Sequence, residues 1–479
     1  MLSVRHSVLI LFILKALAAF SQNCILTGNA SDYAGSSIQV SIIDNPINNS
    51  VRILDSIHVG MDGNFHIRLE MKEMMFLYFD LGIYRGYMYA EPGNEYRLLL
   101  PPFAEPSFSN KINLFYEPVD IHVKVAGIRH QGTQSFFRDT SELNQQISSF
   151  DTLFSIANKE VILNRQRRIR TNTDSILNAL EERYSMSASR VFRDYRRYRY
   201  GLLMINDGRT GLADLVNTYL YDREPQIKDP AYMDLFNAVF DDFLHYYSLT
   251  PEGRNVGSII NREHSLDKLR SELGQHPALS SDTLTDLLIL KEIYNEYFTG
   301  NYVKDALLII LDSLSHHAVD ANYRTFAKMM HDEYTRLIIG NPPPDLLLRD
   351  QHGQYTSLKQ FEGKYIYLFF CTPENYSCMI EYPYLRSYYE RHRDYLEIVT
   401  VMVSENSSDI NSFMEQNQYQ WTALHYDDQP GILQTFNISY FPTAFLIGPD
   451  GNLIQSPATL PSEGFQQQLF RIMRSRGDI

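Results

Sequence analysis

Residues 365–378 read YIYLFFCTPENYSC, and this stretch decides how the C-terminal part of the chain folds. Its first six residues form an unbroken apolar run, which is typical of a β-strand buried on both faces of a sheet. A helix is predicted to follow over 376–393, and Asn375 stands directly before it, where asparagine is a favoured N-cap. The stretch therefore predicts a buried strand that turns into a helix, as in an α/β domain.

The sequence on either side of this stretch continues the alternation of strands and helices. Three consecutive prolines at 342–344 mark the N-terminal boundary, because they cannot continue a helix. Downstream, the pattern predicts a strand over 398–403, a helix over 408–416, a hairpin from 443–447 and 453–454, and a last helix over 463–473. The resulting order is β-α-β-α-β-β-α.

This order resembles the thioredoxin fold, and local motifs strengthen the resemblance. The turn Asp-Gln-His-Gly at 350–353, the run 378–385 and the run Phe-Pro-Thr-Ala-Phe-Leu-Ile at 441–447 resemble those of periplasmic thioredoxin-like thiol-disulfide oxidoreductases. The resemblance covers about 340–479. It implies that Cys378 is the second active-site cysteine of this family and that Pro442 is its cis-proline.

The chain departs from this family at one decisive position. The family carries Cys-x-x-Cys, whose first thiol stands at the helix N-terminus, where unpaired N–H groups and the helix dipole lower its pKa. That thiol is the nucleophile, and the second thiol releases the product. Counting back from Cys378, the first position is Asn375. Ordinary two-cysteine exchange is therefore not expected.

Two routes would still give Cys378 a catalytic role. Cys371 lies seven residues before it, and the two could form a disulfide if their Cα atoms lie about 4.4–6.8 Å apart. Cys371 could equally be a buried, small apolar residue. A peroxidase of the peroxiredoxin type needs Pro-x-x-x-Thr-x-x-Cys, but Pro373 is five residues before Cys378, and Asn375 takes the threonine position. Cys378 and Cys371 are thus the candidate catalytic residues of a thiol-disulfide oxidoreductase or peroxidase.

A binding role would need no thiol. In the thioredoxin fold, the residue before the cis-proline, here Phe441, offers backbone groups to an extended chain, which can be captured by strand addition. The candidate binding residues are therefore Asn375, Tyr376, Phe441 and Pro442. In the plainer interpretation, Pro442 is only a turn that the fold requires. We expect an extended peptide or an envelope protein as partner, and no cofactor.

Residues 1–21 have the pattern of a secretory signal peptide. Arg5 precedes a mostly apolar run over 8–20, and small residues stand at −3 and −1 of a cut before Gln22. This run is too short to span a bilayer, which takes ~20 residues. Cys24 lacks the small residue that lipid-anchor motifs place directly before the cysteine. We expect an exported protein, periplasmic or envelope-associated, without an integral membrane segment in the mature chain.

Residues 22–128 are predicted to form a β-sandwich. Apolar side chains alternate with polar ones over 38–42, and several short strand-like runs are separated by turn residues. The dipeptide Asp62-Gly63 is a strong turn signal and is expected to join the two strands of a hairpin.

Residues 129–340 are predicted to be helical. The arginine-rich runs 165–170 and 193–199 are interpreted as solvated helix faces, the second beside a core-facing stripe that contains Tyr195 and Tyr198. Asp312 and His316 share a helix face, but no cysteine or further convergent ligand supports a metal site there. We therefore expect no metal.

The composition fits a globular protein of several domains. The chain has 479 residues, a net charge of −14 and three cysteines. The acidic balance argues against nucleic acid as a partner, and three cysteines cannot form a disulfide framework. We expect a multidomain α+β protein: a signal peptide (1–21), a β-sandwich (22–128), a helical domain (129–340) and a thioredoxin-like α/β domain (341–479). The leading hypothesis is a binding or folding-support module without ordinary dithiol activity.

Overall fold

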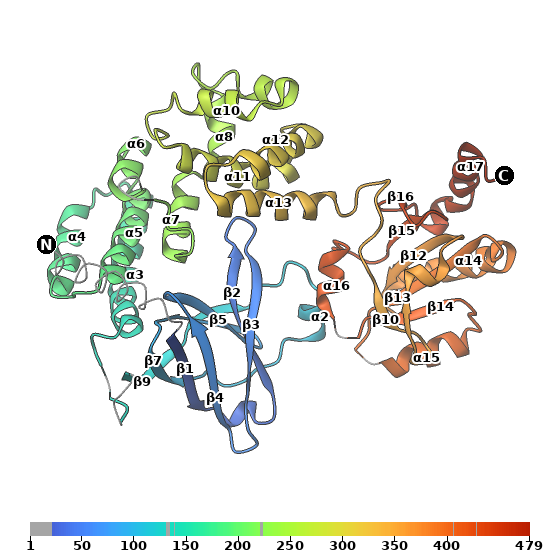
Figure 1. Cartoon of the computed structure of the whole chain (residues 1–479), viewed down its shortest axis with the longest axis horizontal. Coiled ribbons are helices and arrows are strands. Elements are labelled where there is room, and N and C mark those ends of the chain that lie inside the picture. Colours follow the sequence, from blue (N-terminus) through green and yellow to red (C-terminus); the bar gives the residue numbers. More distant parts are fainter. Residues whose placement is uncertain (1–21, 131–134, 138, 221–223, 406, 428) are drawn as a thin grey trace, which may run out of the picture. The chain divides into compact units, whose positions relative to one another are not determined.

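The computed structural model describes residues 22–130, 135–137, 139–220, 224–405, 407–427 and 429–479. The predicted signal peptide, 1–21, lies outside the described residues. The chain divides into two compact units (Figure 1). The first combines the chain up to Glu105 with Pro118–Met330, and the second combines Pro106–Glu117 with His331–Ile479.

Two sheets form the β part of the first unit. One has the strand order β4-β1-β7-β9 and the other β3-β2-β5-β6-β8. Side chains from both sheets join one buried cluster, which includes Leu26, Val40, Phe79 and Leu98. In β4, buried and exposed residues alternate strictly, as expected for a strand with one face on a core. The strands are β1 (Gln22–Asn29), β2 (Ser37–Asn45), β3 (Ser50–His58), β4 (Asn64–Met71), β5 (Met75–Leu81), β6 (Tyr84–Ala90), β7 (Asn94–Leu99), β8 (Val119–His122) and β9 (Lys124–His130).

The predicted hairpin at Asp62-Gly63 is wrong. The turn exists, with Gly63 at φ 78°, but the strands that it joins belong to different sheets, since β3 pairs with β2 and β4 pairs with β1. Only a single antiparallel bridge, Val59 to Phe65, links the two sides of the turn. A tight-turn dipeptide specifies the reversal of the chain, whereas the pairing partner is decided by which sheet buries each strand.

Helices make up the rest of the first unit (Figure 1). The predicted stripe in α5 is confirmed, because Tyr195 and Tyr198 are both buried. Arg196, in contrast, is buried rather than solvated, and its guanidinium donates to Tyr184 O and Glu181 Oε1. The longer helices are α3 (Leu143–Gln166), α4 (Thr173–Tyr184), α5 (Arg190–Asp207), α7 (Pro230–Val239), α10 (Leu266–Leu273), α11 (Asp282–Thr299), α12 (Lys304–His317) and α13 (Ala321–Thr335).

The arginine run 165–170 is only partly helical. Because α3 ends at Gln166, Arg167, Arg168 and Arg170 lie in the connection to α4 and not on a helix face, which corrects the prediction. No helix among the described ranges is both long and apolar enough to cross a membrane.

The second unit is built on a five-stranded sheet with the order β14-β13-β12-β15-β16. The first three strands in that order are parallel, and β15 and β16 run antiparallel to their neighbours. Every residue of β12 is buried, which confirms the predicted central strand. The strands are β12 (Tyr365–Cys371), β13 (Leu396–Met402), β14 (Thr422–His425), β15 (Thr443–Ile447) and β16 (Leu453–Gln455), preceded by the short pair β10 (Leu347–Arg349) and β11 (Tyr355–Ser357).

Helices cover both faces of this sheet. One core cluster joins Phe369 of β12 to side chains of α14 (Tyr376–His392), α15 (Ser407–Gln416) and α17 (Phe465–Arg476). The other joins Phe370 of β12 to α16 (Pro430–Thr435). The second cluster also receives Phe108, Ile112 and Leu114, which come from the segment around α2 (Phe108–Lys111).

Candidate functional site

The strand-to-helix junction after β12 carries most of the predicted site residues. Asn375 caps α14, because its Oδ1 accepts from the backbone N–H groups of Ser377 at 2.8 Å and Cys378 at 3.3 Å. This confirms the predicted N-cap. An asparagine side chain in this role satisfies two amides that would otherwise have no partner within the helix.

The same side chain binds the loop before β15. Asn375 Nδ2 donates to the backbone carbonyl of Phe441, with 3.3 Å between nitrogen and oxygen. The peptide bond between Phe441 and Pro442 is cis, as the family resemblance implies. The structure therefore brings Asn375, Phe441 and Pro442 together. No sequence signal predicts this hydrogen bond, because it joins residues that lie 66 positions apart in the chain.

Cys371 and Cys378 lie together beneath the junction. Both side chains are fully buried, and both thiols are free. The backbone N–H of Thr372 donates to Cys378 Sγ at 3.4 Å. The Cys371 thiol donates to the carbonyl of Thr372 at 3.6 Å. The pKa of Cys378 is lowered, chiefly by the neighbouring Cys371 thiol and further by the Thr372 amide, although burial acts in the opposite direction. The pKa of Cys371 is raised well above its usual value, chiefly by burial.

Two further residues of α14 belong to this environment, and sequence analysis missed both. Tyr382 is buried, and its pKa is raised by burial and by the neighbouring Cys371. The carboxylate of Glu381, also buried, accepts from Ser462 N–H at 2.8 Å and from Ser462 Oγ at 2.6 Å. Because both carboxylate oxygens are engaged by Ser462, Glu381 holds the segment before α17 against α14. Its spacing of three from Cys378 could have indicated that it shares the face of the helix that carries the cysteine.

The solvent side of the junction is aromatic. Tyr376 is 79% exposed and Tyr440 is 59% exposed, and each is next in sequence to one partner of the Asn375–Phe441 hydrogen bond. Ile380 and Tyr384, one and two turns further along α14, are exposed as well. We name these four residues, the three tyrosines Tyr376, Tyr384 and Tyr440 together with Ile380, the aromatic strip. Its first three members share one face of α14, because they are spaced four residues apart.

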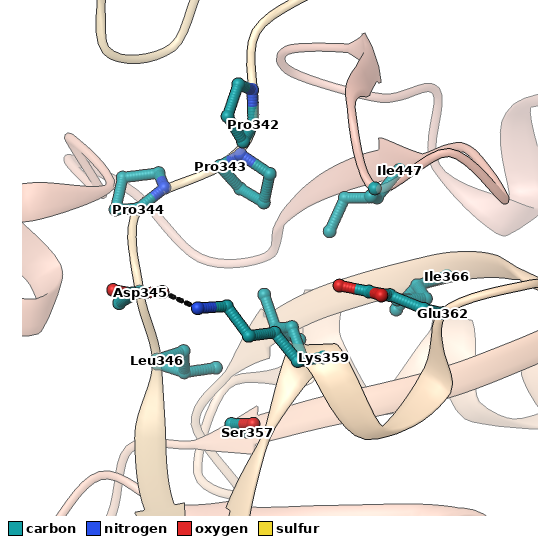
Figure 2. Close-up of a pocket in the computed structure, with 12 residues that line it drawn as sticks. Pro342, Pro343, Pro344, Asp345, Leu346, Ser357, Lys359, Glu362, Ile366 and Ile447 are labelled. Carbon is teal, nitrogen blue, oxygen red and sulfur yellow. Dashed lines mark ion pairs between the residues drawn. The ribbon is translucent and has the colours of Figure 1, made fainter.

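A small cavity of about 90 Å³ lies elsewhere in this unit, beside the proline segment 342–344 (Figure 2). Leu346 and Ile366, which line it, belong to the core cluster on the sheet face opposite the cysteines. Lys359 and Asp345 form an ion pair at its rim, with 3.6 Å between nitrogen and oxygen. None of the predicted site residues lines it. Within the described ranges, no three His, Cys, Asp or Glu side chains gather in a way that could hold a metal ion.

Comparisons with known proteins place the C-terminal region in a family. Residues 363–453 match the thioredoxin-like family model. Thiol-disulfide oxidoreductase ResA of Bacillus subtilis is 29% identical over 121 residues, which are 24% of this chain and 65% of that relative. ResA of Geobacillus kaustophilus is 27% identical over 173 residues, 35% of this chain and 92% of that relative.

A solved thioredoxin domain of a Bacteroides vulgatus thiol-disulfide oxidoreductase is also similar, with 23% identity and a TM-score of 0.26, covering 28% of this chain and 98% of that one. The C-terminal region is therefore a thioredoxin-like domain related to thiol-disulfide oxidoreductases. The chain spans about two thirds of the length of the Bacillus subtilis relative.

Proposed function

We propose that this chain is an exported thioredoxin-like protein of the bacterial envelope that has lost ordinary dithiol exchange and acts as a binding or folding-support module. The observation that carries the proposal is Asn375, which takes the position of the family's nucleophile and uses both ends of its amide in internal hydrogen bonds. An amide cannot form a mixed disulfide. The strand-to-helix junction thus keeps the family's backbone arrangement, whereas Asn375 stands in place of the nucleophilic cysteine.

The burial of Cys378 supports the same proposal. Its pKa is lowered by the neighbouring donors, but its side chain has no exposed surface. Attack on a protein disulfide requires the sulfur to approach its target in line, and a thiol enclosed beneath the junction cannot do so without displacement of α14. Cys378 by itself therefore does not replace the missing nucleophile.

The binding role rests on the aromatic strip. Exposed aromatic side chains are enriched at protein interfaces because they bury a large area at a small cost in conformational entropy. The carbonyl of Phe441 already accepts from Asn375, so side chains of the strip, more than this carbonyl, would supply contacts to an extended peptide or an envelope protein. Tyr376 and Phe441 are the two predicted binding residues that would lie closest to such a partner.

The proposed organisation has four parts: a signal peptide over 1–21, a β-sandwich over 22–128, a helical domain over 129–340 and the thioredoxin-like domain over 341–479. The single core cluster shared by the two N-terminal sheets supports the sandwich. The charged start, short apolar run and small-residue exit of 1–21 support export.

An insulin-reduction assay on the chain that begins at Gln22 tests the loss of dithiol activity. We expect insulin to be reduced by dithiothreitol at the same rate with and without the protein. Turnover that disappears in Cys378→Ser would overturn the proposal. Cys24→Ser is the matched control, because it also removes one fully buried thiol, but in the other unit.

One observation favours a second candidate function, a thiol peroxidase. Cys371 and Cys378 lie together at the junction, and the Cys371 thiol lowers the pKa of Cys378. A Cys378 thiolate would attack one oxygen of hydrogen peroxide, giving a sulfenic acid and hydroxide, and the Cys371 thiol would then displace water to form a disulfide. Mass spectrometry after treatment with peroxide tests it: a Cys371–Cys378 disulfide would support this candidate, and two permanently free thiols would exclude it.

A further inference from the structure

The first unit contains a cavity of about 420 Å³ whose charged lining is dominated by arginine. Arg165, Arg168, Arg170 and Arg209 line it, together with Asp207. The first three come from the end of α3 and the connection to α4, and Arg209 follows the end of α5. We call these four residues the arginine pocket. Its volume is within the range of small-molecule sites, roughly 300–1,000 Å³.

Two of the four guanidinium groups are fixed by the fold. Arg165 Nη1 donates to the carbonyls of Ile205 at 3.2 Å and Asn206 at 3.1 Å, in the last turn of α5. Gly208 leaves room for this side chain, because a Cβ at that position would lie 2.5 Å from Arg165 Cζ. Arg209 Nη2 donates to Asp207 Oδ1 at 2.8 Å. These contacts hold two cations at the wall of the pocket before any ligand arrives.

Arg209 is also tied to the other wall of the pocket. Its Nη2 donates to the carbonyl of Thr171 at 2.8 Å and to Thr173 Oγ1 at 2.7 Å. The residues after α5 and the start of α4 are therefore held together through one guanidinium. Hydrogen bonds thus fix the end of α5 and the residues after it to the end of α3 and to the start of α4, and these segments form the walls of the pocket.

The other two arginines of the pocket add positive charge that no neighbouring carboxylate balances. Arg168 and Arg170 are exposed, and within the described part of the chain neither forms an ion pair with a carboxylate. Arg168 has φ 58°, a conformation that is uncommon for a residue with a Cβ and that turns the connection at this point. Asp207 and, at longer range, Asp174 are the acidic groups that act on Arg209, so positive charge remains in excess.

The sequence around the arginine pocket carries a net positive charge, whereas the chain as a whole is negatively charged. Residues 159–209 contain twelve basic and six acidic residues, whereas the full chain has a net charge of −14. A second cavity, of about 350 Å³, lies between α4 and α5 and is lined by Arg193, Arg196 and Arg197, with Glu181, which pairs with Arg196, as its acidic residue. Positive charge is therefore concentrated around α4 and α5, where it attracts anions from solution.

We propose that the arginine pocket binds a phosphate-bearing ligand. A guanidinium group presents two parallel N–H donors that match the oxygens of phosphate, and several such groups around one cavity satisfy a multiply charged anion. Two of the four cations are held in place, and within the described residues only Arg209 has a carboxylate partner, so a phosphate group adds the missing negative charge. The ligand is either a soluble phosphate compound or the phosphate headgroup of a lipid.

Isothermal titration calorimetry with inorganic pyrophosphate, on the chain that begins at Gln22, tests the proposal. We expect saturable binding that weakens as salt is raised and that becomes about tenfold weaker in Arg170→Ala, a change of about 1.4 kcal/mol, since one charge-assisted contact to the phosphate is lost. Arg167→Ala is the matched control: it removes the same charge from the same connection, but Arg167 does not line the pocket.

A second experiment distinguishes the two sources of phosphate. Sedimentation with vesicles of phosphatidylglycerol in phosphatidylcholine would show binding that is lost in Arg170→Ala if the ligand is a lipid headgroup. Binding of pyrophosphate without vesicle binding identifies a soluble ligand. Absence of binding in both experiments, or an equal loss in Arg167→Ala and Arg170→Ala, would overturn the proposal.

Discussion

Cys24 in the first unit and Cys378 in the second are both fully buried, yet their surroundings act on them in opposite directions. Burial raises the pKa of Cys24 to about 12, and Glu91 adds to the effect. The pKa of Cys378 is lowered, because the Cys371 thiol and the Thr372 amide outweigh its burial. Cys24 lies in a strand whose amides bond to other strands, whereas Cys378 lies in the first turn of a helix.

The difference teaches that the surroundings of the junction after β12 lower the pKa of a buried thiol, whereas burial in the first unit raises it. Donors placed around a sulfur lower its pKa whether or not that sulfur can reach a substrate. In the proposed function, Asn375 stands where the family has its accessible thiol, and the donors around Cys378 are still present. The predictions that follow test this contrast between the two cysteines and the two units.

The largest expected effect is the alkaline destabilisation caused by Cys24. The folded state keeps this proton up to about pH 12, whereas the unfolded chain releases it near pH 9, so stability falls as the pH rises through this interval. At about 1.4 kcal/mol per pH unit, Cys24 accounts for a loss of about 3 kcal/mol between pH 9 and pH 11. Urea unfolding of the wild type and Cys24→Ala between pH 8 and pH 11 measures the difference. Equal slopes with pH in the two proteins would contradict the prediction.

Removal of the cap at the junction should have the next largest effect. Asn375→Ala deletes the acceptor for two amides of α14 and the donor to Phe441, and we expect it to destabilise the second unit by about 1–2 kcal/mol. Asn375→Asp is the matched control, because it keeps the N-cap acceptor and loses only the hydrogen bond to Phe441. Chemical unfolding should place its stability between those of the wild type and Asn375→Ala, and an alanine variant as stable as the wild type would exclude a capping role.

The contact between the two thiols can be tested by removing one of them. Cys371→Ala removes the thiol that lowers the pKa of Cys378, so this pKa should rise, and less thiolate should be present at pH 8. The thiolate absorbance near 240 nm, followed against pH in a Cys24→Ser background, measures this directly. A titration curve of Cys378 that does not move would mean that the Thr372 amide alone sets its pKa.

The smallest effect on stability is expected at the aromatic strip. Tyr376→Ala should change the free energy of unfolding by less than about 0.5 kcal/mol, because the side chain is 79% exposed. It should nevertheless weaken binding of a reduced, carboxymethylated model protein by severalfold in a fluorescence titration. Tyr355→Ala is the control, since Tyr355 is 62% exposed and lies outside the strip. An equal effect of both variants would show that the strip has no special role.

Much of the second unit could be predicted because its signals are local. An apolar run of strand length and an asparagine before a helix each act within a few residues, and β12 and the cap at Asn375 followed. The cis bond before Pro442 followed from the family resemblance instead. The contacts that define the site could not be predicted, since they join distant segments. The bond from Asn375 to Phe441 and the arginine pocket are examples.

The misread features have the same physical origin. Asp62-Gly63 specifies a turn, but the choice of sheet on each side depends on burial of whole strands. The arginine run near 165–170 has a helical spacing of charge, but the chain leaves the helix at Gln166 and folds around the end of α5. In both cases the sequence correctly indicated a turn or a surface position. It could not indicate which distant segment of the chain these residues would pair with or contact.

The central claim is that one substitution, at Asn375, separates this domain from dithiol chemistry. The most direct test is insulin reduction by Asn375→Cys, which restores the Cys-x-x-Cys spacing with Cys378. The account predicts reductase activity in Asn375→Cys, none in the wild type, and none when Cys378→Ser is added to Asn375→Cys. Wild-type turnover that requires Cys378, or an Asn375→Cys variant that folds and remains inactive, would contradict it.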